Sequence, residues 1–438
     1  MVKGALITIG SEERAGGDTP HAVYGASSAS IWMNCHGMFN LLNNARKSGA
    51  VPERDGGSRY AHEGTLAHEA GENVIIGWLK GQSLDIEVPD EIEDVADFKA
   101  AVQEYLDAVA PVLRDGGEWF GVEVQVDLNE LYERNDFLLA GPHQVEAFKR
   151  SAPLFGTADF VALRGNKLFV MDYKHGAGVP VDAVGNPQLK YYALGAMLRA
   201  EAEGLGPVED IEVTIVQPRA PGPSIKPASY KRAELLEFGM DLVASVVATT
   251  KDDAKLKAGK WCQFCKAASA PCPKLAERAR EIAKNHFTAI GPDAEPIEQP
   301  QALGPDELAK ALDELPVLQE WIKNVQRAAT GRISRGEAIK GYKAVRARAN
   351  RRWDDENAVL EKVLADDTAV VDAIAPRRVL SVAQMEKAAK AGVAADPSRL
   401  RDILAEHTTR PDGAITYAPE SDPRPAETPA KDSFDEIE

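Results

Sequence analysis

The sequence predicts an α/β protein, with a mixed sheet that helices flank. Alternating apolar and polar residues at 121–128 and 211–219 are typical of strands with one buried face. Two apolar runs on either side of Arg164–Lys167 form a predicted hairpin. Between the hairpin and the strand at 211–219 lies a predicted helix at 187–204, with proline at its start and glycine at its end. Strands that alternate with a helix in this order are typical of an α/β sheet.

The first part of the chain is expected to supply helices and two further strands. Ser27–Ser30 can cap a helix over IWMNCHGMFNLLNNAR, so we predict that Cys35 lies within a helix. Residues 63–81 form a predicted helix that glycine closes, and 92–113 form another. The opening stretch is expected to contribute two strands, and one further helix is expected before the cysteines at 262–272.

Composition predicts two domains and a tail. A proline-rich stretch is a predicted linker, and the proline-rich, acidic end of the chain is a predicted disordered tail. The predicted parts are an N-terminal segment at 1–26, an α/β domain at 27–290, the linker at 291–305, a helical basic domain at 306–410 and the tail at 411–438.

Charge and hydropathy restrict the class of protein. The 438 residues carry a net charge of -17, which argues against a surface coated with basic residues for duplex binding but leaves a local basic channel open. No apolar run approaches the roughly 18 residues that a membrane helix needs. We therefore expect a cytoplasmic protein with no membrane partner.

The predicted hairpin places acidic residues inside apolar strands. If Gly165–Asn166 form a two-residue turn, then paired positions sum to 331 and Asp159 lies opposite Asp172. Side chains alternate along a strand, so Lys174 shares the face of Asp172. A slip of one residue in the register would break this arrangement.

Facing carboxylates at about 5 Å repel each other, and their burial is costly unless a positive charge lies between them. A divalent cation such as Mg²⁺, which prefers oxygen ligands, would remove the conflict. Lys174 could then orient or help to deprotonate a water molecule, and stabilise charge on a phosphate. The alternative is a partly exposed end of the sheet with a simple Lys–Asp ion pair.

The motifs GTAD, ending at Asp159, and DYK, at Asp172–Lys174, resemble those of the PD-(D/E)XK nuclease superfamily, and of its RecB-type branch in particular. The resemblance implies a restriction-endonuclease-like fold and a deoxyribonuclease that depends on Mg²⁺ or Mn²⁺. It implies that Asp159 and Asp172 bind the metal and that Lys174 is catalytic. The branch also carries a histidine on an upstream helix, which implies that His68 in GTLAHEA is a further metal ligand.

Two further features complete this comparison. The branch has a Q-x-x-x-Y motif, which Gln188 and Tyr192 match, so they are expected to contact the DNA backbone or to brace Lys174. Glu72 stands where a zinc-protease motif H-E-x-x-H would need histidine, so that motif is absent. Glu123 is a weaker candidate for a metal ligand or for a residue behind the ligands, and an ordinary surface glutamate is the alternative.

The chain has four cysteines, Cys35, Cys262, Cys265 and Cys272. In a reducing cytosol they suggest zinc or an iron–sulfur cluster, which the spacing does not separate; four unrelated thiols are the remaining alternative. His36 or His286 could replace a cysteine in a zinc site. One cysteine before the nuclease core and three after it resemble the iron–sulfur staple of AddB and of CRISPR-associated RecB-like exonucleases. This resemblance implies a [4Fe–4S] cluster on all four.

A basic segment at 321–352 contains ten Lys or Arg residues and one acidic residue. Trp321, Tyr342 and Trp353 lie in or beside it, so it could follow phosphates and stack single-stranded bases. The alternative is a solvated helix face that pairs with acidic residues. The expected DNA-binding residues are Lys340, Lys343, Arg346, Arg348, Arg351 and Arg352. The stretch GYKAVRARANRRW also resembles a phage and prophage family of RecB-like proteins without an assigned function.

These resemblances imply a metal-dependent DNA exonuclease that acts on single-stranded ends in phage or prophage recombination or DNA processing, in the cytoplasm of a bacterial host. The expected partners are DNA and a phage single-strand-binding or recombination protein. Two alternatives remain open from the sequence. One is a structure-specific endonuclease on the same core, and the other is a non-catalytic iron–sulfur or zinc module that binds nucleic acid.

Overall fold

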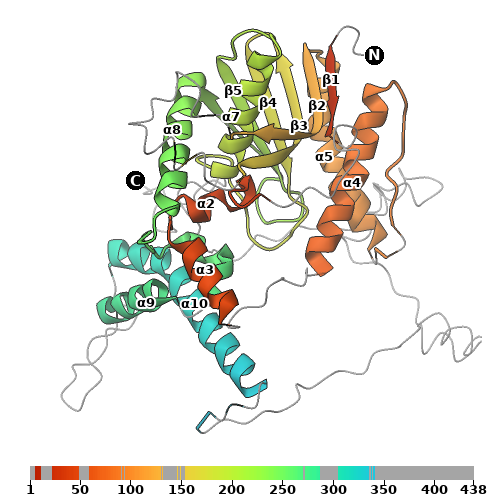
Figure 1. Ribbon diagram of the computed structural model, residues 1–438. Helices are drawn as coiled ribbons and strands as arrows, with labels where there is room; N and C mark the ends of the chain where they lie inside the picture. Colours follow the sequence, from red (N-terminus) through yellow and green to blue (C-terminus); the bar gives the residue numbers. More distant parts are fainter. Residues whose placement is uncertain are drawn as a thin grey trace, which may run out of the picture. The chain divides into compact units, whose positions relative to one another are not determined.

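A computed structural model gives the arrangement of the chain (Figure 1). It describes residues 5–10, 22–48, 59–129 without 90 and 93, 131, 146, 148, 153–269, 272–286, 304–334, 337 and 339–340. The described residues fall into a larger unit, within 1–93 and 101–328, and a smaller unit, within 94–100 and 329–416. No helix in the described part of the chain combines the length and the apolar character that crossing a membrane requires.

Six strands form one mixed sheet in the order β1-β2-β3-β4-β5-β6 (Figure 1). Pairs β1–β2 and β4–β5 are parallel, and the other pairs are antiparallel. The predicted mixed α/β class is therefore confirmed. The strands are β1 (Leu6–Ile9), β2 (Trp119–Asp127), β3 (Phe155–Arg164), β4 (Lys167–Tyr173), β5 (Asp210–Val216) and β6 (Ile225–Lys231).

The hairpin of β3 and β4 has the register that the sequence predicts. Its pairs run from Arg164–Lys167 at the turn to Phe160–Met171, and each pair sums to 331. Gly165 has φ 58, a left-handed conformation that favours glycine in a tight turn. The turn and the apolar runs on both sides therefore determine this register.

The β3–β4 ladder ends at Phe160–Met171. Beyond it, β3 continues along β2 as far as Phe155, whereas β4 continues along β5 as far as Tyr173. The sheet thus divides into two halves, and Asp159 and Asp172 are the first residues past the division. We call this place the sheet fork.

Helix α7 (Pro187–Ala202) crosses one face of the sheet, with contacts to β2, β3, β4 and β5, and connects the parallel strands β4 and β5. Its N-cap is Asn186, whose side chain accepts hydrogen bonds from the backbone N–H groups of Gln188 and Leu189. Helix α8 (Arg232–Thr249) packs against α7. Helix α4 (Arg59–Leu79) contacts β2, and α5 (Val95–Arg114) leads into that strand (Figure 1).

The prediction of one helix around Cys35 is wrong. The structure has two short helices, α2 (Ala29–Trp32) and α3 (Met38–Lys47), and Cys35 lies in the turn between them. At Gly37 the backbone N–H donates to the carbonyl of Lys255 at 2.9 Å. A Cβ on Gly37 would lie 2.5 Å from the carbonyl oxygen of Ala254. This close backbone contact with a distant segment, together with the glycine that permits it, interrupts the helix.

Other differences concern the ends of the fold. Within the described residues the opening stretch supplies one strand, β1, where two were expected. Strand β6 was not predicted, because it is an edge strand that is mostly exposed and contains Pro227. Beyond α8 the chain forms the short 3-10 helices Lys260–Phe264 and Lys266–Ser269, then α9 (Pro273–His286) and α10 (Pro305–Ser334). The predicted tail, most of the linker and residues 341–410 lie outside the described residues.

Candidate metal centre and cysteine site

Three carboxylates occupy one level across neighbouring strands. In the β2–β3 ladder the pairs Val122–Phe160 and Val124–Ala158 flank Glu123, which places Glu123 opposite Asp159. Asp172 is the first residue of β4 past the last β3–β4 pair, and its carboxylate lies close enough to Asp159 for the charge of Asp159 to act on it. Like charges opposite one another destabilise a sheet. This row of acids therefore calls for a positive charge.

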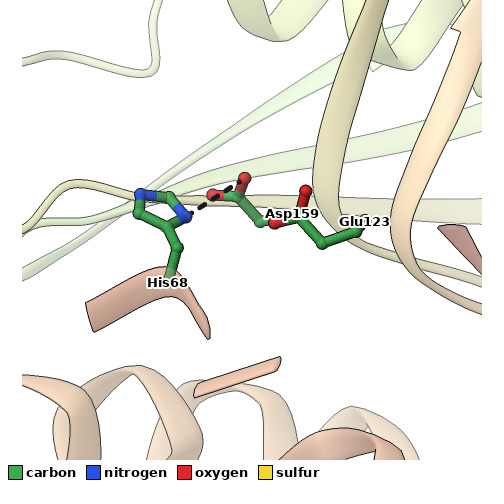
Figure 2. A group of neighbouring side chains, drawn as sticks. All are labelled: His68, Glu123 and Asp159. Carbon is green, nitrogen blue, oxygen red and sulfur yellow. Dashed lines mark ion pairs between the residues drawn. The ribbon is translucent and has the colours of Figure 1, made fainter. Parts of the chain in front are cut away.

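Helix α4 brings a histidine to the same place. The ligand atoms of His68, Glu123 and Asp159 all lie within 4.8 Å of one another, as a metal site requires (Figure 2). His68 Nδ1 is 3.5 Å from Asp159 Oδ1. The sequence predicted His68 and Asp159 as ligands and gave Glu123 only a weak case. The structure places Glu123 with them and so favours it over an ordinary surface glutamate.

The backbone of Glu123 is unusual. Its φ of 51 makes it the one non-glycine residue with positive φ among the described residues. A left-handed conformation in a residue with a side chain costs free energy and concentrates at functional sites. No pattern in the sequence signals this conformation, because it arises inside a strand that otherwise alternates regularly.

Asp172 is 1% exposed and lies beside cationic and amide groups. Its Oδ2 is 2.7 Å from Lys174 Nζ. Gln188 Nε2 donates to Asp172 Oδ1 at 3.2 Å and also lies 3.0 Å from Tyr192 Oη. Gln188 therefore braces Asp172 in this structure, whereas the sequence suggested Lys174 as the group that the motif would brace.

Asp159 compensates for the lost strand pairing at the sheet fork. Its Oδ2 accepts a hydrogen bond of 2.7 Å from the backbone N–H of Tyr173, which lies past the last β3–β4 pair. The carboxylate thus takes the place of a ladder hydrogen bond. This contact ties the two halves of the sheet together where they separate.

The charged groups of the site shift one another's pKa values. Burial alone would raise the pKa of Asp159, but His68, Lys174 and the Tyr173 N–H hold it below its usual value. Burial, with the charge of Asp159, raises the pKa of Asp172 despite the opposing effect of Lys174. The pKa values of the two aspartates are therefore shifted in opposite directions.

The two cationic groups are both stabilised in their charged forms. Burial acts to lower the pKa of His68, but Asp159, Glu123 and Asp172 raise it to about 9. Burial likewise acts to lower the pKa of Lys174, and the charges of Asp172 and Asp159 raise it above its usual value. A lysine that keeps its proton can stabilise negative charge but is a poor base. Of the two roles that the sequence suggested for Lys174, charge stabilisation fits this environment better.

The four cysteines form a second cluster, the cysteine site, and none is in a disulfide. Cys35 and Cys262 are buried, and Cys265 and Cys272 are partly buried. Cys265 packs against the buried clusters that contain Cys35 and Cys262, and Cys272 packs against the latter. The fold therefore gathers residues that lie more than 200 positions apart in the sequence.

Backbone N–H groups point at two of these sulfurs. Lys257 N–H donates to Cys35 Sγ at 3.3 Å, and Gly259 N–H donates to Cys262 Sγ at 3.4 Å. Burial raises the pKa of both thiols, and charge on Cys272 would raise both further. These shifts favour neutral thiols, so the sulfurs would ionise on binding a cation, and N–H donors to sulfur are a feature of thiolate-bound metal sites. Four thiols are a donor set that an iron–sulfur cluster or zinc takes, but no three of these sulfurs lie within 4.8 Å of one another in the described part of the chain, so the arrangement is more open than a tetrahedral zinc site.

The structure describes only one of the six predicted DNA-binding residues, Lys340. Lys340 is exposed, and Trp321 on α10 is 39% exposed. The remaining predicted residues lie outside the described part of the chain: Lys343, Arg346, Arg348, Arg351 and Arg352. His286, a proposed alternative zinc ligand, belongs to α9, but its side chain is not among the described ones.

Comparisons with known proteins place the chain in a family. A solved structure titled "Crystal structure of SSO0001" is similar at 11% sequence identity, over 60% of this chain and 91% of that chain, with a TM-score of 0.23. A TM-score this low does not establish a common fold. A family model matches residues 21–425, which agrees with the expected membership of a family without an assigned function. The chain belongs to the family described as "Protein of unknown function (DUF2800)".

Proposed function

We propose that this protein is a metal-dependent DNA nuclease of the PD-(D/E)XK superfamily, in its RecB-type branch. The observation that carries the proposal is the row of Glu123, Asp159 and Asp172 at the sheet fork, with Lys174 2.7 Å from Asp172. Buried acids that repel one another are stable beside a cation. A lysine on the same strand suits a reaction in which negative charge develops on a phosphate.

The residues at the fork fit a hard divalent cation. Carboxylate oxygens from Glu123 and Asp159 and the imidazole of His68 would hold Mg²⁺ or Mn²⁺, and Asp172 lies on the adjacent strand. When bound, such an ion lowers the pKa of water and offsets charge on a phosphoryl oxygen. The site combines oxygen ligands with one nitrogen, which suits Mn²⁺ at least as well as Mg²⁺.

The chain's own groups have separate tasks in this proposal. The Tyr173 N–H holds Asp159, and Gln188 holds Asp172, so both carboxylates keep fixed orientations. Lys174 keeps its proton and presents positive charge toward the scissile phosphate. An exonuclease on single-stranded ends is the activity that the resemblance to RecB-type enzymes supports.

We further propose that the cysteine site holds a [4Fe–4S] cluster that joins the turn at Cys35 to the segment at 262–272. The support is the convergence of all four cysteines and the two N–H donors to sulfur. Anaerobically purified protein should be brown, with four iron atoms per chain. A colourless protein with one zinc atom per chain would instead show that the four cysteines bind zinc.

A nuclease assay on anaerobically purified protein tests the main proposal. End-labelled linear DNA and circular DNA are incubated with Mg²⁺, Mn²⁺ or EDTA, and Asp172→Ala is run beside the wild type. We expect loss of linear DNA that requires the metal and that the substitution abolishes. Cleavage of circular DNA would instead identify an endonuclease on the same core.

The cysteine site also supports a second candidate, a module that binds nucleic acid without cutting it. This candidate predicts DNA binding by cluster-loaded protein and no cleavage of any substrate. It also predicts that Asp172→Ala leaves DNA affinity unchanged. That combination of results would overturn the nuclease proposal.

A further inference from the structure

A chain of four side chains lies beside the metal centre and has no role in the chemistry proposed above. Tyr173 Oη lies 2.8 Å from His175 Nδ1, and His175 Nε2 lies 3.0 Å from Glu63 Oε1. Arg219 Nη1 donates to the same Glu63 oxygen at 2.7 Å and to the carbonyl of His175 at 3.4 Å. We call Tyr173, His175, Glu63 and Arg219 the bracing chain.

The bracing chain connects three separate elements. Glu63 is on α4, Tyr173 ends β4 with His175 just beyond it, and Arg219 follows β5. The bracing chain therefore fixes α4 to the half of the sheet that contains β4 and β5. His175 is 4% exposed, and both of its ring nitrogens are engaged, so its ring has one orientation.

Two members of the bracing chain, Glu63 and Tyr173, link it to the metal centre. Glu63 precedes His68 by five residues on the same helix. Tyr173 follows Asp172 directly, donates its N–H to Asp159, and has its ring centroid 5.3 Å from that of His68. Tyr105 stacks on the Tyr173 ring, and the two ring centroids lie 4.9 Å apart.

A brace is needed because the three metal ligands come from different elements. Glu123 and Asp159 lie on paired strands, whose spacing the sheet fixes, whereas His68 comes from α4, outside the sheet. A metal site requires its ligands to stay within about 0.5 Å of the productive geometry. The position of α4 relative to the sheet therefore decides whether His68 and Asp159 can bind the same ion.

We propose that Glu63, His175, Arg219 and the Tyr173 hydroxyl are positioning residues that hold α4 at the sheet fork, and so set the affinity of the His68–Glu123–Asp159 centre for its cation. The proposal rests on the metal site of the proposed function but not on the reaction that follows. Partners behind metal ligands commonly contribute 10- to 100-fold to metal affinity. The bracing chain would affect metal affinity indirectly, because it positions the helix that carries His68.

The test measures Mn²⁺ affinity by electron paramagnetic resonance of the free ion, in full-length protein. Glu63→Gln removes the charge that Arg219 and His175 share, and Tyr173→Phe removes only the hydroxyl while it keeps both ring contacts. Glu212→Gln is the matched control, because it breaks a 2.9 Å ion pair with Lys167 at the other end of the sheet. The Tm of each variant in EDTA reports stability separately.

We expect Glu63→Gln and Tyr173→Phe to weaken Mn²⁺ binding by about 10-fold or more, and Glu212→Gln to leave it unchanged. Equal Mn²⁺ affinity in the wild type and the two variants, with only a lower Tm in EDTA, would show that the bracing chain is purely structural. That result would overturn the proposal. If Glu63→Gln fails to fold, Tyr173→Phe alone decides.

The two proposals fail in different ways. Wild-type protein that binds Mn²⁺ and cuts no DNA would contradict the nuclease and leave the bracing chain testable by the same binding measurement. Wild-type protein that cuts DNA while both variants bind Mn²⁺ normally would support the nuclease and overturn the bracing role.

Discussion

At the scale of single residues, the candidate site collects features that are unfavourable by themselves. Glu123 has a left-handed backbone, and Asp172 is a carboxylate buried to 1% exposure. His68 carries a pKa of about 9, because three carboxylates surround it. A divalent cation would offset the electrostatic costs, so the protein should behave differently with the metal and in EDTA.

The backbone of Glu123 can be tested by comparing Glu123→Gly with Glu123→Ala. Both changes remove the carboxylate, but only glycine adopts φ 51 without steric cost. We expect the glycine variant to be about 1 kcal/mol more stable than the alanine variant in EDTA, measured by urea unfolding. Both variants should bind Mn²⁺ less tightly than wild type. An alanine variant at least as stable as the glycine variant would contradict the left-handed conformation.

His68 predicts a pH dependence of the metal-free protein. Its pKa in the folded state is about 9, against the usual 6.5. A raised pKa gives stability that is present below about pH 6.5 and is lost as the pH rises through about 9. We expect the free energy of unfolding in EDTA to fall by up to about 3 kcal/mol across this range.

The control for this prediction is His68→Gln, whose stability in EDTA should change much less between pH 6.5 and pH 9. Urea unfolding of both proteins at several pH values gives the comparison. A wild-type curve parallel to that of His68→Gln would show that the histidine does not titrate in this environment.

At the scale of secondary structure elements, α7 supports the site from its first turn. Asn186 caps the helix, and Gln188 in that turn holds Asp172. The cap therefore stabilises a helix and also places a side chain that orients a carboxylate. The same α7 crosses four strands and contributes much of the buried core.

The cap can be tested by Asn186→Ala. It removes the acceptor for the N–H groups of Gln188 and Leu189, which should destabilise the protein by about 1 kcal/mol. Asn186→Asp keeps an acceptor and should recover most of the loss, as measured by urea unfolding. An alanine variant as stable as the wild type would mean that water or another group replaces the cap at no cost.

At the scale of the whole molecule, the cysteine site joins distant parts of the chain. Cys35 lies between α2 and α3, and the other three cysteines lie after α8, so ligation would close a loop of more than 200 residues. Closing a long loop lowers the entropy of the unfolded chain. Metal loss should therefore loosen the fold as well as remove the cofactor.

Cys35→Ala tests this link. We expect the variant to lose the visible absorbance of the cluster and to unfold at a lower temperature than the wild type, by an amount equivalent to several kcal/mol. Both proteins are purified anaerobically and compared by absorbance, iron content and Tm. The same change in apo-protein, prepared by chelation, should have little effect. An equal loss in holo- and apo-protein would assign Cys35 a packing role alone.

The sequence by itself determined the α/β class, the β3–β4 register, the start of α7 and the residues Asp159, Asp172 and Lys174 as candidates, whereas His68 was a candidate only through the resemblance to RecB-type nucleases. These features depend on local chemistry: a Gly–Asn turn, alternation with period two, and a proline at the start of the helix. Such signals lie within a few residues of the structure that they specify, so they can be read without the fold.

Only the tertiary structure decided the remaining features. The turn at Cys35 depends on a backbone contact with Ala254 and Lys255, the place of Glu123 depends on its register with β3, and the bracing chain depends on α4 meeting the sheet. Each joins positions between 36 and more than 200 residues apart in the sequence. Contacts at this range leave no periodic pattern, because the partner that determines each conformation is set by the packing of other elements.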